Sequence, residues 1–537
     1  YGSISKQIRN EDCYLQRGIA FNTIGSAFSA RKFRYAAVFS NAASSIFGEN
    51  LDEVLCCLNR TESRFILESL NPTVNFQVGD VNRLPLSREP GASQIAKRLD
   101  EAFSAHESAR ESSVEFKRPG PSPWRYAQDW AQRAVDRPDG APLPPYQAEY
   151  DPPEPAAFVS FAVGVALGRF GGNGEGILDG APHPNPLPGS AGAREPEALP
   201  HGILFLGEEG RDSLEHPACA VLLEAWKEHG AAVGEGDDLR TYLQRSFFDW
   251  HKRLYENRPI YFPLSSARRS YVAFVSIHRF AGSWGDGGKW GDGGRWGDSA
   301  LNVLLADHLL PERRRLEGEL DDIRKARTEA KGRGKAERRF AEVSKLLEEL
   351  SDFIAKVTEV AEHGPPAPDD KTPKREQDAR FAMDLDDGVM VNSAALWPLL
   401  ESQWKDPKKW WKELATAQGR KDYDWSHLTA HYFPSRVREK CVQDPSLAVA
   451  HHCFWELHPA KAYAWELRLQ DEIRPDFTID EPDSFQHRAA FLKAHPEEVE
   501  AAQTKEAQRR ARKAAKTDDD TDAPLLDRTE GEEASDA

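Results

Sequence analysis

Methionine is nearly missing from this chain of 537 residues, which holds only Met383 and Met390 and begins with Tyr1. An open reading frame begins with methionine, so we expect the chain to be the C-terminal part of a longer protein. A leader peptide upstream of Tyr1 would be invisible in this sequence.

Cysteine and long apolar segments are scarce as well. Six cysteines are too few for a disulfide scaffold in a chain of this length, and Cys56 and Cys57 lie in an apolar helical pattern. The longest apolar run, residues 156–167, is shorter than the about 20 residues that span a bilayer. These shortages predict a cytoplasmic protein with free thiols and no membrane partner.

An excess of basic residues is also lacking. The chain has 70 Lys and Arg against 87 Asp and Glu, a net charge of −17, which excludes a uniformly basic nucleic-acid coat but not a local basic face. Part of the acidity is concentrated in residues 517–537, which hold nine acidic residues and one basic residue. Residues 1–88 hold ten basic and eight acidic residues and are therefore mildly basic.

Aromatic residues are abundant, with 14 Trp, 26 Phe and 13 Tyr, so the chain can build large cores and is not globally disordered. Short β-like runs and longer helical patterns predict an α+β protein. We expect six segments: a mixed N-terminal domain at 1–88, a Pro-rich connector at 89–155, a mixed α/β domain with low-complexity insertions at 156–306, an antiparallel coiled-coil hairpin at 307–364, a Trp-rich, mainly α-helical domain at 378–500, and a disordered charged tail at 501–537.

Within these segments the apolar spacing predicts individual elements. Residues 51–70 predict one continuous helix, which Asn71-Pro72 ends, and residues 74–80 indicate a strand followed by a turn. Apolar residues in steps of three, four and seven over residues 309–363 predict the two arms of the coiled coil.

Two short motifs superficially resemble catalytic or cofactor elements. Residues 170–176 are Gly-rich, and residues 156–167 could supply the strand that a nucleotide-binding loop requires, but a Pro-rich insertion follows instead of a helix. Residues 151–154, Asp-Pro-Pro-Glu, resemble the motif that grips a flipped base, but Glu154 stands where an aromatic ring would stack. We expect both motifs to be structural.

Metal-ligand patterns are weak in this chain. Possible nitrogen and sulfur ligands gather near the C-terminus without the usual Cys-x-x-Cys spacing. They are Cys441, His451, His452, Cys453 and His458. We therefore expect this chain to bind no metal and, by itself, no cofactor.

Seven polar residues of the first segment are candidates for contact with DNA. Arg and Lys suit phosphates and guanine edges, whereas Asn and Gln suit adenine edges. The candidates are Arg31, Lys32, Arg34, Asn71, Asn75, Gln77 and Arg83. A solvated surface is the alternative interpretation for each of them.

Two blocks of sequence carry a family resemblance. The first contains Phe28-Ser29-Ala30-Arg31, Ser45-Ile46-Phe47, Leu58-Asn59, residues 71–80 and Leu84-Pro85-Leu86. The second contains Phe248-Asp249-Trp250-His251, residues 258–266, Ile277-His278-Arg279 and Leu309-Leu310-Pro311. The first block resembles the target-recognition segment, and the second the region that follows it, in the large adenine-specific DNA methyltransferases of bacteriophage-exclusion (BREX) systems, called PglX. Residues 384–482 resemble the C-terminal extension of some of these proteins.

The resemblance implies that residues 1–88 form a target-recognition domain for double-stranded DNA. It implies a full-length protein that transfers a methyl group from S-adenosylmethionine to adenine N6 and works with other phage-defence proteins. In the family, the cofactor loop and the Asn-Pro-Pro-aromatic motif lie upstream of the segment that begins here, and neither is found in this chain. No catalytic residue can be carried over, so we expect this chain alone to be inactive and to need an upstream methyltransferase domain. The alternatives are a free-standing DNA-specificity subunit and a coiled-coil interaction scaffold that does not bind DNA.

Overall fold

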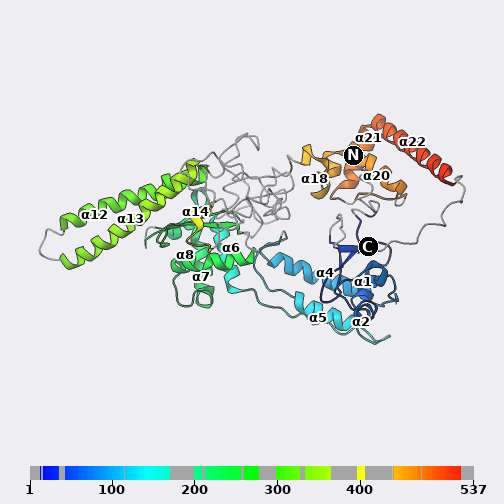
Figure 1. Ribbon diagram of the computed structural model, residues 1–537, viewed down its shortest axis with the longest axis horizontal. Coiled ribbons are helices and arrows are strands. Elements are labelled where there is room, and N and C mark those ends of the chain that lie inside the picture. The colour runs from blue at the N-terminus through cyan, green and yellow to red at the C-terminus, as the bar shows by residue number, and fades with distance from the viewer. Residues whose placement is uncertain are drawn as a thin grey trace, which may run out of the picture. The chain divides into compact units, whose positions relative to one another are not determined.

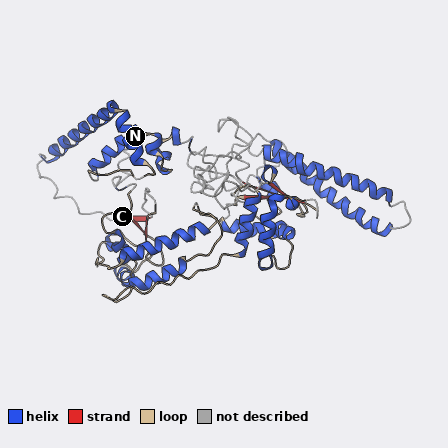
Figure 2. Ribbon diagram, turned by 180° about the vertical axis from the view of Figure 1, so that it is seen from behind, coloured by secondary structure: helices blue, strands red, loops and turns tan. Residues whose placement is uncertain are grey.

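The computed structural model describes residues 13, 16–34, 43–86, 88–113, 115–138, 140–169, 199–208, 212–255, 259–276, 298–326, 333–363, 396–405, 438, 441–472, 475–479 and 481–521. The chain divides into two compact units. The first comprises Tyr1–Ile95, Gln132–Leu143 and Arg438–Ala537, and the second comprises Ala96–Ala131 and Pro144–Val437. Helices predominate and the sheets are small and antiparallel (Figure 2), so the α+β class expected from the sequence is confirmed.

The N-terminal lobe of the first unit is built on a three-stranded antiparallel sheet. Its strands are β1 (Ile19–Asn22), β2 (Ala30–Lys32) and β3 (Ala43–Ile46), in the order β2-β1-β3. Helices α1 (Leu51–Leu58), α2 (Thr61–Leu70) and α3 (Val78–Val81) follow (Figure 1). Apolar side chains from the sheet, the helices and the intervening loops share one core, which includes Ile19, Phe21, Phe28, Leu58, Leu67, Phe76 and Val81.

The single helix expected over residues 51–70 is wrong, because the chain breaks between α1 and α2 at Asn59 and Arg60. The Asn59 side chain accepts a hydrogen bond from the Ala30 N–H (3.1 Å) and donates to the Ala30 carbonyl (3.0 Å). Arg60 then adopts extended dihedral angles. A contact with a distant strand therefore overrides the helical periodicity. The turn expected at the end of residues 74–80 is also helical, because residues 78–81 form α3.

Helices α4 (Ala92–Ala109) and α5 (Trp124–Val135) lie within residues 89–155, the expected connector. Helix α6 (Pro155–Ala166) begins at the end of that stretch. Residues 156–167, which could have supplied a strand before the Gly-rich stretch, instead lie in α6 and its C-cap. Proline at the first helical position and the alanines favour the helix, and most of its residues are buried. The Gly-rich stretch itself lies outside the described residues.

A second antiparallel sheet, in the order β4-β6-β5, forms the core of the second unit. Its strands are β4 (Ile203–Leu206), β5 (Tyr261–Ser265) and β6 (Val272–Ser276). The helical elements of this region are η3 (Pro200–Gly202), η4 (Ser213–Glu215), η5 (Pro217–Cys219), α7 (Ala220–Val233), α8 (Leu239–Arg245), α9 (Phe247–Leu254), α11 (Asp298–Val303), the π-helix η6 (Leu304–Leu309) and α14 (Trp397–Leu400).

The two expected hairpin arms are helices α12 (Leu310–Ala326) and α13 (Arg333–His363), which pack against each other (Figure 1). Arg339 of α13 donates through Nε to Glu319 of α12 at 2.7 Å, and both arginines Arg315 and Arg339 bind Glu208 beside β4. The turn expected at residues 331–335 is wrong in its second half, because α13 already begins at Arg333. Residues 327–332 lie outside the described residues. The coiled-coil geometry stays a prediction.

The described C-terminal part is helical: α18 (Pro445–Ala450), α19 (Phe454–Leu457), α20 (Pro459–Glu472), α21 (Ser484–Ala494) and α22 (Pro496–Thr521). Helix α22 extends as far as Thr521 into the stretch that the sequence predicted as a disordered tail. Gln503 donates to the Tyr463 hydroxyl of α20, and Arg509 pairs with Asp471, so α22 is held by tertiary contacts. Among the described residues, no helix is both long and apolar enough to cross a membrane.

Candidate nucleic-acid interface

Two loops of the N-terminal lobe lie side by side, and we call them the paired loops (residues 22–29 and 71–78). Ile24 and Asn75 face each other in an isolated antiparallel bridge. The Gly25 N–H donates to the Val74 carbonyl at 2.9 Å, and the Phe76 N–H donates to the Thr23 carbonyl at 2.8 Å. Segments about fifty residues apart in sequence thus form one surface.

Two asparagine side chains hold the paired loops in shape. Asn22 Oδ1 accepts from the Ser29 N–H at 2.7 Å, and its Nδ2 donates to the Ala27 carbonyl at 2.9 Å. Asn71 Oδ1 accepts from the Thr73 N–H (3.2 Å) and hydroxyl (2.7 Å), while its Nδ2 donates to the Asn75 carbonyl at 3.1 Å. These are side-chain turns that replace backbone pairing in a loop. Asn71 is thus engaged in holding its own loop, although the sequence suggested it as a base reader.

Aromatic side chains anchor the same loops from below. The rings of Phe28 and Phe76 lie 5.2 Å apart, edge to face, and both side chains are buried. Phe21 of β1 lies 5.6 Å from Phe28. On either side of buried Phe76, Asn75 and Gln77 are exposed. The anchored phenylalanine therefore fixes which side chains the loop presents to solvent.

The basic candidates differ in availability. Arg31 lies on β2, opposite Ala20, and is exposed, and Arg83 is exposed just after α3. Lys32 Nζ lies 2.8 Å from Asp52 Oδ1, so a carboxylate partly neutralises it. Arg34 is half-buried beyond β2. Arg31, Arg83, Asn75 and Gln77 are the exposed members of the predicted set.

Exposed aliphatic side chains on the paired loops and α3 were missed by the sequence reasoning. Ile24 is 70% exposed, Val74 is 61% exposed and Val78 is 51% exposed. Val74 and Val78 lie in residues 74–80, which the sequence predicted as a strand followed by a turn, because valine is typical of strands. The alternation of Val74, Phe76 and Val78 with amide residues is the signal that marks a two-faced segment, but it does not say which face is buried.

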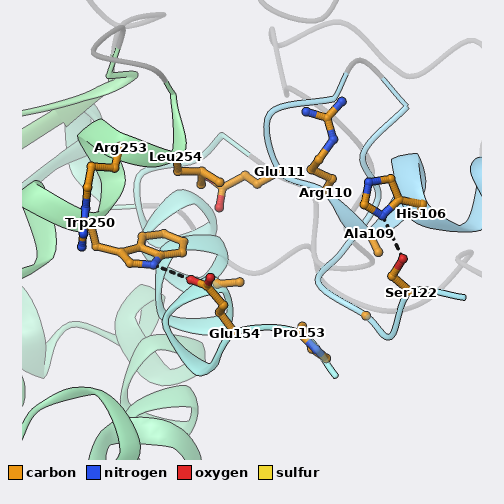
Figure 3. A pocket seen from close by; sticks show the side chains of 12 residues that line it. His106, Ala109, Arg110, Glu111, Ser122, Pro153, Glu154, Trp250, Arg253 and Leu254 are labelled. Carbon is orange, nitrogen blue, oxygen red and sulfur yellow. Dashed lines mark hydrogen bonds between the residues drawn. The ribbon is translucent and has the colours of Figure 1, made fainter. Parts of the chain in front are cut away.

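The second unit contains a cavity of about 540 Å³ beside the end of α4, the start of α6 and helix α9 (Figure 3). Trp250 Nε1 donates to Glu154 Oε2 at 2.8 Å, and His106 Nδ1 lies 2.8 Å from the Ser122 hydroxyl. Burial lowers the pKa of His106. Glu154, which follows the two prolines of the Asp-Pro-Pro-Glu motif, therefore orients a tryptophan of another helix.

The described residues around the two motifs do not match an S-adenosylmethionine site. The segment before the Gly-rich stretch is the helix α6 instead of the strand that an S-adenosylmethionine loop requires. Asp151 of the Asp-Pro-Pro-Glu motif accepts from Arg125. Within the described part of the chain, no group of three or more His, Cys, Asp or Glu side chains could hold a metal ion. No chemical step can be derived from these residues through either group.

Comparison with known proteins finds two distant relatives of this chain. No protein-family model matches the chain. The chain is 23% identical over 474 residues to the adenine-specific methyltransferase BrxX of Escherichia coli O9:H4 (strain HS). The aligned region covers 73% of this chain and 37% of BrxX. It is also 22% identical over 469 residues to the adenine-specific methyltransferase PglX of Lacticaseibacillus casei (strain Zhang). This aligned region covers 73% of this chain and 35% of PglX.

The chain is thus similar, at 22–23% identity, to two adenine-specific methyltransferases, BrxX and PglX. The family expected from the sequence motifs is supported at this level. The chain spans little more than a third of the length of these relatives.

Proposed function

We propose that this chain is the DNA-recognition and accessory part of a BREX-type adenine-specific methyltransferase whose catalytic domain lies upstream. The paired loops carry the proposal, because they present exposed amides beside exposed arginines on a scaffold held by buried side chains. The homology to BrxX and PglX supports the choice of DNA as partner. A methyltransferase acting on a flipped base leaves the choice of sequence to other contacts with the duplex.

Each class of side chain has its own role in this proposal. Arg31 and Arg83 contact phosphates, which supply affinity and orientation without sequence information. Asn75 and Gln77 contact base edges in the major groove. Asn71 and Asn22 position the loops. S-adenosylmethionine belongs to the upstream domain, and other phage-defence proteins are further proposed partners.

A salt titration tests the DNA partner. Fluorescence anisotropy of the full chain with a labelled 30-base-pair duplex should give an affinity that falls steeply between low and moderate salt. The double variant Arg31→Gln/Arg83→Gln should bind more weakly and lower the slope of log K against log salt by about two. Arg324→Gln, an exposed arginine of α12, is the matched control and should leave the slope unchanged. No binding at low salt would favour the scaffold alternative.

A separate test concerns the upstream domain. The reading frame 5′ of Tyr1 should continue and encode a cofactor loop and an Asn-Pro-Pro-Tyr or Asn-Pro-Pro-Phe motif. A stop codon followed by a start codon close to Tyr1 would instead support a free-standing specificity subunit that pairs with a separate methyltransferase.

A further inference from the structure

We infer that Ile24 and Asn75 act together as a reader of adenine–thymine base pairs, with Ile24 on the thymine methyl group and Asn75 on the adenine edge. The inference rests on the proposed function and specifies which base pair the paired loops recognise. It also gives a role to the exposed side chain of Ile24.

The first observation is the bridge between the two residues. Ile24 and Asn75 are directly opposite each other in antiparallel pairing. Residues opposite each other in such a pair have side chains on the same face, with Cβ atoms about 5 Å apart. An aliphatic group and a carboxamide are therefore placed next to each other, and both are exposed.

The second observation is that the backbone of Asn75 is already engaged. Its N–H donates to the Thr73 hydroxyl at 3.3 Å, and its carbonyl accepts from Asn71 Nδ2 at 3.1 Å. The side chain of Asn75 is left facing solvent on a loop whose shape is fixed. Preorganised side chains lose less conformational entropy on binding than mobile ones do.

The chemistry of the major groove matches this pair of side chains. Adenine presents the N7 acceptor beside the N6 amino donor, and a carboxamide can bind both at once. Thymine presents the C5-methyl group, which is the apolar feature that distinguishes it from cytosine in the groove. A guanine–cytosine pair offers neither the adenine pattern nor the methyl group. An isoleucine beside an asparagine therefore selects adenine–thymine.

The alternative without a binding role is that Ile24 is one of the isolated exposed hydrophobic residues that most proteins carry. Phe65 of α2 is such a residue, with 71% exposure. It lies outside the paired loops and provides an internal control of the same lobe. A protein contact through Ile24 is the other alternative, and the experiment below separates it from base recognition.

The test uses the full chain and a pool of 30-base-pair duplexes with a randomised centre, from which bound molecules are sequenced. Adenine–thymine pairs should be enriched at one or more fixed positions. The selected duplex is then remade with uracil in place of thymine at those positions, which removes only the methyl group. Wild-type affinity should fall about fourfold for each contacted methyl, as expected for losing one buried methyl contact. A second duplex carries 7-deazaadenine, which removes N7, and should bind at least about fivefold more weakly.

The variants assign these losses to residues. Ile24→Ala should bind the thymine and uracil duplexes with equal affinity. Asn75→Ala should bind the adenine and 7-deazaadenine duplexes with equal affinity. Phe65→Ala should keep both discriminations. Salt-dependent DNA binding without adenine–thymine enrichment, or with no effect of uracil, overturns the inference and leaves the proposed function intact. Binding to no duplex at any salt overturns both. An Ile24→Ala variant that keeps the discrimination but no longer binds a methyltransferase domain assigns this residue to a protein interface and also overturns it.

Discussion

Arg169 Nη1 lies 2.9 Å from Glu111 Oε1, and the two side chains are only 3% and 2% exposed. The same guanidinium nitrogen donates to the Tyr255 and Tyr261 hydroxyls at 3.0 Å each, and the Tyr255 hydroxyl donates to Glu111 at 3.1 Å. Burial raises the pKa of Glu111, and the charge of Arg169 opposes that rise. Residues from the loop after α4, the end of α6, the end of α9 and strand β5 are thereby joined inside the second unit.

Removing one partner of this pair should be costly. Arg169→Met leaves the Glu111 carboxylate buried without its cation, so we expect the second unit to lose about 3–5 kcal/mol of unfolding free energy. Urea unfolding measures the loss of unfolding free energy, and hydrogen exchange of the β5 amides locates it in the second unit. Arg98→Met removes an exposed pair with Glu101 and should cost less than about 1 kcal/mol. Equal losses in the two variants would contradict the assignment.

The neighbouring His251 should make stability depend on pH. Its Nε2 accepts from the Ile260 and Tyr261 N–H groups, and burial, aided by the charge of Arg169, lowers its pKa well below 6.5. Below about pH 6.5 the unfolded chain binds a proton that the folded chain does not, so stability falls as the pH falls. His251→Gln should flatten this dependence by up to about 1.4 kcal/mol per pH unit. The control His201→Gln, at an exposed position, should keep the slope. An unchanged slope in His251→Gln would show that other groups cause it.

The parts of the fold that local pattern determines were predictable. The apolar steps of three, four and seven predicted the positions of α12 and α13, because apolar residues recur on one face of α12 from Leu310 to Ile323 and of α13 from Phe340 to Val360. Residues 156–167 were ambiguous, since a short run buried on all sides has no period that separates strand from helix. The break at Asn59 could not be predicted, because its cause is a hydrogen bond to Ala30, twenty-nine residues away.

The candidate interface was predictable in composition but not in arrangement. Residue type suggested Asn71 and Asn75 equally, and only the geometry gives Asn71 to its own turn and leaves the Asn75 side chain exposed. The juxtaposition of Ile24 and Asn75 depends on pairing between distant loops, which has no local signal in one sequence.

Glu349 should hold helix α13 to the turn between β5 and β6. Its carboxylate accepts from the Ser266 hydroxyl (2.5 Å), the Arg268 N–H (2.8 Å) and the Ser270 hydroxyl (2.8 Å), and the side chain is buried. Glu349→Ala leaves these donors without an acceptor, so we expect a loss of at least about 2 kcal/mol. Hydrogen exchange of residues 266–271 should become faster, whereas the exposed neighbour Glu348→Ala should not change it. Unchanged exchange in Glu349→Ala would mean that apolar packing alone holds the helix.

Asp136, which follows α5, should cap helix α2 of the N-terminal lobe. Its Oδ1 accepts from the Thr61 N–H at 2.8 Å and its Oδ2 from the Thr61 hydroxyl at 2.7 Å, while Arg60, at the N-cap position, makes no side-chain cap. Burial would raise the pKa of Asp136, but the hydrogen bonds from Thr61 outweigh it and hold the pKa below its ordinary value. Asp136→Ala should therefore cost about 1–2 kcal/mol.

The matched variants for this cap are Asp136→Asn and Asp100→Ala. Asparagine keeps an acceptor for the Thr61 N–H, so Asp136→Asn should cost less than Asp136→Ala. Asp100→Ala removes an exposed carboxylate from α4 and should have little effect. Hydrogen exchange in α2 reads out all three variants. Because α2 leads directly into the paired loops, Asp136→Ala should also weaken DNA binding, whereas unchanged exchange in α2 would show that this carboxylate does not support the lobe.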